Sequence, residues 1–67
     1  MIADADIWRA AEILIKRHGP DAAIVAAQHA DALLAEGDVE GQLVFKAILK
    51  AITELQRGML SDGERVN

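Results

Sequence analysis

The chain has 67 residues, of which 52% are hydrophobic and thirteen are alanine, and it contains no cysteine. This length allows one small domain, and the missing cysteine excludes disulfide scaffolds, thiol catalysis and cysteine-based zinc fingers. The net charge of −4 has the wrong sign for a protein that mainly neutralises phosphates, so nucleic acid is an unfavoured partner.

Glycines and helix-starting residues divide the chain into three segments. Glycine suits the left-handed residue that follows many helices, and three glycines each follow a helix-forming run: Gly19, Gly37 and Gly58. Residues that favour the first turn of a helix stand at Asp6, Pro20 and Asp38. These signals predict helices over residues 6–18, 20–36 and 39–57. Because no segment alternates as a strand would, the predicted fold class is all-α.

Each predicted helix has an apolar side when residues are placed about 100° apart. In the first helix this side consists of Ile7, Ala10, Ala11, Leu14, Ile15 and His18. In the second it consists of Ala22, Ala23, Ala26, Ala27 and Ala30. In the third it consists of Gly41, Val44, Phe45, Ile48, Ala51, Ile52 and Leu55. The small side chains of the second helix predict a slim central element with bulkier helices on both sides.

The connections between the helices are short, so consecutive helices are expected to reverse direction and form a compact three-helix unit. We predict that this unit spans residues 1–58 and that residues 59–67 form a mobile tail, because they lack helical spacing and apolar content. There is no apolar run of membrane-spanning length and no pattern of a signal peptide. We therefore expect a cytoplasmic protein without membrane contacts.

Residues able to carry chemistry are few. His18 and His29 have no second ligand three or four residues away on the predicted helices, and Ser61, the only serine, lies in the predicted tail. We interpret His18 as a helix-end residue and His29 as a residue on the polar side of its helix. The sequence thus predicts no catalytic residue, no metal site and no cofactor, and the protein is not expected to be an enzyme.

One stripe of the third helix is cationic. Lys46, Lys50 and Arg57 lie on its polar side, which is an alternative anion-binding surface of the kind found in a helix-turn-helix regulator. Asp38 and Glu40 precede this stripe and would repel phosphates. An ordinary solvated helix face is therefore the preferred interpretation, and nucleic-acid binding stays the alternative.

Several apolar residues do not fit the predicted core, which should also hold Phe45 and, in part, Trp8. These residues lie off the main apolar sides of their helices: Ile13, Ile24, Val25 and Leu43. A second apolar surface on so small a domain indicates a contact with another chain. We therefore expect a homodimer, and these four residues are the interface candidates.

The string Asp6-Ile7-Trp8-Arg9-Ala10-Ala11, with His18-Gly19 and Gly37-Asp38 further on, resembles a family of very short bacterial proteins classed as a domain of unknown function. That family often has a tryptophan where this chain has Phe45. The resemblance implies a bacterial cytoplasmic protein and carries over no catalytic or binding residue. The resemblance adds no activity, and the exposed apolar residues alone lead us to predict a self-associating helical protein-interaction module, such as an adaptor or a regulatory subunit.

Overall fold

The structure is a computed structural model that describes the backbone of residues 3–66 and the side chains of residues 3–58. Within this part the chain is helical and contains no strand, which confirms the predicted all-α class. The elements are the helix α1 (Asp4–His18), a 3₁₀ turn η1 (Gly19–Asp21), the helix α2 (Ala22–Ala35) and the helix α3 (Val39–Val66).

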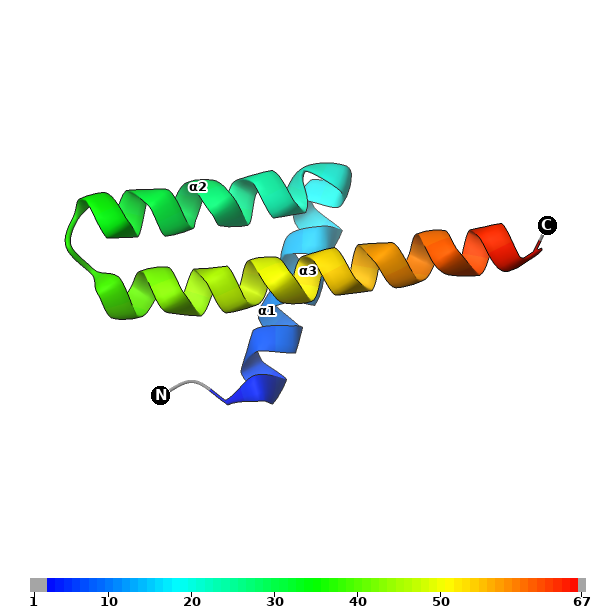
Figure 1. Cartoon of the computed structure of the whole chain (residues 1–67), viewed down its shortest axis with the longest axis horizontal. Helices are drawn as coiled ribbons and strands as arrows, with labels where there is room; N and C mark the ends of the chain where they lie inside the picture. The colour runs from blue at the N-terminus through cyan, green and yellow to red at the C-terminus, as the bar shows by residue number, and fades with distance from the viewer. Residues whose placement is uncertain (1–2, 67) are drawn as a thin grey trace.

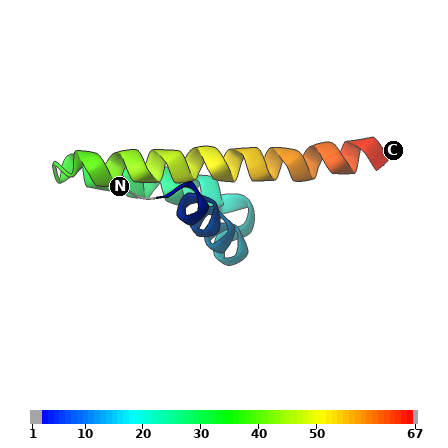
Figure 2. The same cartoon turned by 90° about the horizontal axis from the view of Figure 1, so that it is seen from below.

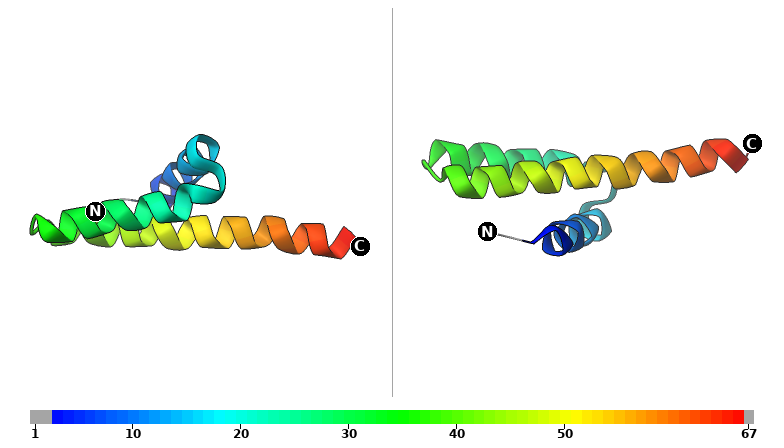
Figure 3. Two further views of the ribbon diagram at one scale, coloured as in Figure 1. Left: turned by 90° about the horizontal axis from the view of Figure 1, so that it is seen from above. Right: turned by 60° about the horizontal axis from the view of Figure 1, so that its bottom comes forward.

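Helices α2 and α3 form an antiparallel hairpin, and α1 crosses one face of this hairpin at a steep angle (Figure 1). The views from below and from above show α1 standing off that single face, while the opposite face carries no helix (Figures 2 and 3). α3 contacts both other helices, and α1 contacts α3 more extensively than α2. The prediction of α2 as the central element is therefore wrong, because α3 has the long bulky side that both neighbours share.

The turn between α2 and α3 is fixed by local hydrogen bonds. Gly37 has φ 83°, and its N–H donates to the carbonyl of Leu34, while the N–H of Asp38 donates to the carbonyl of Leu33. This pair of bonds is the Schellman ending of a helix, which requires a left-handed residue. The Asp38 carboxylate then accepts a hydrogen bond of 2.9 Å from the N–H of Gly41, so Asp38 caps the start of α3.

Helix α1 ends at His18, as the sequence predicted, and a turn follows it. Gly19 follows α1 with φ 55°, and its N–H donates to the carbonyl of Ile15. Pro20 lies in η1 and not in the first turn of α2, so α2 begins at Ala22, two residues later than predicted. α1 begins at Asp4, two residues earlier than predicted, because Asp4 and Asp6 both suit the positive end of the helix dipole.

The predicted end of the third helix is wrong. α3 runs through Gly58 and reaches Val66. A single glycine inside a helix costs only about 1 kcal/mol relative to alanine, and Gly58 does not have the positive φ that ends α1 and α2. The mobility predicted for residues 59–67 concerns a segment whose side chains, and at Asn67 the backbone, lie outside the described residues.

The extra length of α3 changes the shape of the molecule. The radius of gyration is 12.9 Å and the principal extents are 46 × 22 × 16 Å. A compact domain of this length has a radius of gyration of about 11 Å. The sequence predicted a compact unit, but the molecule is elongated. The reason is that α3 continues well beyond the region that α1 and α2 cover (Figure 1).

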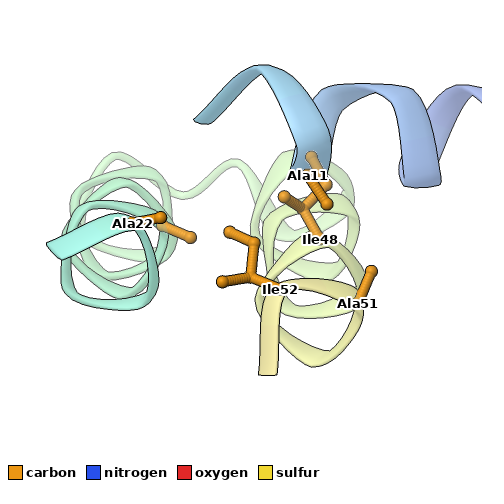
Figure 4. Close-up of a cluster of buried hydrophobic side chains, with 6 residues drawn as sticks. Ala11, Ala22, Ile48, Ala51 and Ile52 are labelled. Carbon is orange, nitrogen blue, oxygen red and sulfur yellow. The ribbon is translucent and has the colours of Figure 1, made fainter. Parts of the chain in front are cut away.

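The core lies where α1 crosses the hairpin. Its buried side chains come from all three helices: Ala11, Ala22, Ala26, Ala30, Ile48, Ala51 and Ile52. Figure 4 shows Ile52 of α3 between the two hairpin helices on the side of Ala22, and Ile48 below Ala11 of α1. The alanine side predicted for α2 is confirmed, because Ala22, Ala26 and Ala30 are its buried residues. They follow one another at intervals of four and let α2 lie close to α3.

Candidate interaction surfaces

An apolar groove opens in the angle between α1 and the hairpin. It has a volume of about 230 Å³ and is lined by residues of all three helices: Ala10, Ile13, Leu14, His29, Phe45 and Ile48. His29 and Phe45 lie nearer to the α2–α3 turn than Ala22 and Ile52, which lie under the crossing point of α1. The groove is therefore the uncovered part of the hairpin face beside α1, on the side of the turn.

Two aromatic rings form the wall of this groove on the hairpin. The rings of His29 and Phe45 are stacked, with centroids 5.1 Å apart and an angle of 28° between their planes. Phe45 packs against the core but is only half-buried, whereas the sequence predicted it inside the core, and His29 is exposed. The prediction that His29 lies on the polar side of α2 did not include this stacking. The contact could have been anticipated, since residue 29 is only about 60° from the buried Ala26.

A second hollow lies between the beginning of α1 and the outer side of α3. It has a volume of about 270 Å³, and its lining mixes apolar and charged residues: Asp4, Ile7, Trp8, Ala47, Lys50, Ala51 and Glu54. Trp8 is 40% exposed at its edge, which agrees with the predicted partial exposure of this ring. With Asp4 and Glu54 beside Lys50, the hollow offers no uniformly cationic surface to an anion.

The four interface candidates of the sequence analysis do not form one surface. Ile13 is 48% exposed and lines the groove, and Val25 is half-buried. Ile24 and Leu43 are more than half exposed, but each points away from the inner side of its own helix. Because the inner sides of α2 and α3 face each other, Ile24 and Leu43 lie on opposite edges of the hairpin.

Other exposed apolar side chains went unnoticed in the sequence. Leu34 is 53% exposed and Val39 is 56% exposed, on either side of the hairpin turn. Leu34 lies in the last turn of α2, at the end of the hairpin that α1 does not cross. The exposure of Leu34 could have been predicted from its position in the last helical turn before Gly37.

The alternative anion-binding residues do share one side of α3. Lys46, Lys50 and Arg57 are all exposed, and their spacing of four and seven residues places them on a single stripe. Glu54 follows Lys50 at a spacing of four on the same helix, which lowers the local positive charge. Within the described residues, no three histidine, aspartate or glutamate side chains are grouped so that they could hold a metal ion.

Comparison of the chain with protein-family models, with curated proteins and with solved structures finds no match. The resemblance to a bacterial family of unknown function therefore stays a prediction. Over the described residues, no helix has the length and hydropathy to cross a bilayer.

Proposed function

We propose that this protein is a small helical interaction module that works as a homodimer, in which each copy covers part of the apolar side chains that the other leaves exposed. The observation that carries the proposal is the imbalance between core and surface. Among the described side chains, Ile52 is the only large one that is fully buried. In contrast, six large apolar side chains are at least 40% exposed: Trp8, Ile13, Ile24, Leu34, Val39 and Leu43.

The total surface area supports the same proposal. The chain has an accessible surface of 4966 Å², whereas a folded monomer of 7.2 kDa exposes about 4,100 Å². Part of the excess of roughly 800 Å² comes from α3, which continues beyond the region that α1 and α2 cover, and the whole excess is comparable to the area that one partner buries in a standard protein–protein interface. A single core in a chain of this size supplies only about 3–5 kcal/mol, so burial of exposed apolar side chains in a dimer adds stability that the monomer lacks.

The experiment that tests the proposal is sedimentation equilibrium combined with thermal unfolding at several concentrations. We expect a dimer at micromolar concentration and a Tm that rises with protein concentration, because association stabilises the folded state by mass action. A folded monomer whose Tm does not depend on concentration would contradict the proposal. A homodimeric interaction module of this kind would act as an adaptor or a regulatory subunit, and neither role requires a catalytic residue, a metal or a cofactor.

Nucleic-acid binding through Lys46, Lys50 and Arg57 stays the second candidate, and their exposure along one stripe of α3 favours it. A helix-turn-helix unit joins its two helices at about 90–120°, whereas α2 and α3 run antiparallel. A titration with duplex DNA at low salt separates the two candidates. Binding that weakens steeply with salt and is lost in Lys46→Glu would favour this second function.

A further inference from the structure

We infer that the apolar groove beside α1 receives the α2–α3 turn of a second copy of this chain, so that two hairpins stack face to face over their tips. This inference rests on the proposed function and names the surface through which the two copies meet. The tip is the part of the hairpin between the crossing point of α1 and the turn at Gly37. On the side where α1 lies, none of the described helices covers this tip (Figures 2 and 3).

The uncovered tip has a face without acidic residues, lysine or arginine. His29 of α2 and Ile48 of α3 line the groove, so residues at helical spacing from them share this side of the hairpin. On α2 these residues lie four positions before and after His29, and on α3 they lie three, four and seven positions before Ile48. We call the set the tip face: Val25, His29, Leu33, Gly41, Val44 and Phe45. All six are exposed or half-buried, so the chain itself leaves this face partly open to solvent.

The side of α1 that borders the tip has apolar residues at its centre and a positive charge at its C-terminal end. Ala10 and Ile13 line the groove. Arg17 lies four positions after Ile13, so it continues the same side, and it is exposed in the last turn of α1. α1 runs from the outer side of α3 to the start of α2 (Figure 1). Arg17 therefore lies at the level of α2.

The turn carries the matching negative charge. Glu36 follows the last residue of α2 and is exposed. It lies seven positions after His29, so it belongs to the side of α2 that carries the tip face. The backbone carbonyls at the end of α2 add negative partial charge at the same place. When the turn of a second copy packs against α1, it brings this negatively charged helix end toward Arg17.

A twofold axis that is parallel to α1 and lies midway between the two hairpins gives this contact twice. The second hairpin then lies above the first and not within its layer. α2 stacks on α2 and α3 on α3 in antiparallel order, so the two tips form a four-helix bundle. The two α1 helices lie at opposite ends of this bundle and in different layers.

The dimensions of the hairpin allow this stacking. Helices pack at about 8–10 Å from one another, so α1 and the tip of the second copy both fit in the layer above the first hairpin. α2 continues about 13 Å beyond Ala26, which belongs to the core under α1. This length holds the tip of the partner, whose turn ends beside α1.

Charge reversal tests this arrangement with the full-length chain. Arg17→Glu places two carboxylates opposite each other at both contacts of the dimer, and Glu36→Arg places two guanidinium groups there. We expect each variant alone to have a Kd about tenfold higher at low ionic strength, measured by sedimentation equilibrium. An equimolar mixture of the two variants restores both opposite-charge contacts in the heterodimer, so its Kd returns to within about threefold of the original, on the same basis.

Matched controls separate the interface from effects on single helices. Lys16→Glu makes the same charge change as Arg17→Glu in the same last turn of α1, but residue 16 lies about 100° around the helix from Arg17. Asp31→Arg makes the same charge change as Glu36→Arg on α2, about 160° around the helix from His29. Both controls are expected to keep the Kd within about threefold. Circular dichroism checks that every variant keeps its helix content.

A pair of apolar residues tests the groove itself. Ile13 lines the groove and is 48% exposed, whereas Ile24 is 57% exposed on the outer edge of α2. Both are exposed enough that aspartate at either position leaves the core of the single chain in place. We expect a Kd at least about tenfold higher for Ile13→Asp, because the dimer loses burial of an apolar side chain at both contacts. Ile24→Asp should stay within about threefold on the same basis.

Disulfide formation gives an independent measurement, since the chain has no cysteine of its own. A mixture of Arg17→Cys and Glu36→Cys chains is expected to form covalent dimers faster than either variant alone, because these two positions face each other across the dimer.

The outcomes distinguish this inference from the proposed function. A chain that stays monomeric at micromolar concentration overturns both. A dimer that keeps its Kd in Arg17→Glu, Glu36→Arg and Ile13→Asp, and that forms no mixed disulfide, leaves the proposed function standing but overturns the stacking of the tips.

Discussion

The side-chain amide of Gln56 donates a hydrogen bond of 3.0 Å to the backbone carbonyl of Gly19. The two residues are 37 positions apart, and the bond is partly buried. The same carbonyl also accepts a hydrogen bond from the backbone N–H of Ala22 at the end of η1, so the Gln56 amide is its second donor. The middle of α3 is thereby tied to the junction between α1 and α2.

Gln56→Ala is expected to lower the free energy of unfolding by about 0.5–1 kcal/mol, because the partly buried bond between α3 and the Gly19 carbonyl is lost while the Ala22 N–H stays bonded to that carbonyl. Gln28→Ala is the control, since Gln28 is an exposed residue of α2. Urea denaturation of both variants at one protein concentration measures the difference. Equal stability of the two variants would mean that water replaces the Gln56 amide without cost.

Asp38→Ala is expected to destabilise the protein by about 1 kcal/mol, because the start of α3 loses the carboxylate that binds the N–H of Gly41. Asp31→Ala removes the same charge from an exposed position inside α2 and is expected to have little effect. Thermal unfolding followed by circular dichroism checks both. A larger loss in Asp31→Ala would contradict the capping role.

Substitution by alanine is expected to affect the stability of the protein differently at two glycines of α3. Apart from its chain neighbours and the backbone of its own helix, a Cβ at Gly58 would have no atom within 4 Å, so Gly58→Ala should stabilise α3 by about 0.5–1 kcal/mol through helix propensity. A Cβ at Gly41 would lie 2.6 Å from a carboxylate oxygen of Asp38. Gly41→Ala therefore displaces the cap and loses that gain. A comparison of the two melting temperatures decides the matter, and an equal rise in both would show that the cap adapts.

Ala26→Leu is expected to cost about 1–3 kcal/mol, because Ala26 is fully buried against α3 and three added carbon atoms would push the helices apart. Ala27→Leu should cost less, since Ala27 is only half-buried, and Ala32→Leu is the exposed control on the same helix. Chemical denaturation gives the order. If Ala32→Leu were as harmful as Ala26→Leu, overpacking would not be the cause.

Local patterns were enough to predict the fold class and the inner sides of the helices. Gly37 and Asp38 were correctly assigned to the turn because both act through neighbouring backbone groups. Gly58 was misjudged because glycine permits a helix to end but does not require it.

The surfaces were harder to predict, since their composition depends on how the helices cross. Ile13 and Phe45 are far apart in the sequence, and only the crossing of α1 over the hairpin brings them to one groove. Placing residues about 100° apart around each helix identified Ile24 and Leu43 as residues that lie off the apolar side. It could not show that they lie on opposite edges of the hairpin, because that depends on the pairing of α2 with α3.

The turn at Gly37 and Asp38 has a consequence for folding kinetics. Because the end of α2 and the start of α3 are both fixed by bonds between residues at most five positions apart, the hairpin closes through contacts that are close in sequence. Chains rich in such contacts fold within microseconds to milliseconds. We therefore expect the α2–α3 hairpin to form first and α1 to pack onto the formed hairpin afterwards. The association of two chains is then the slow step, and its rate depends on protein concentration.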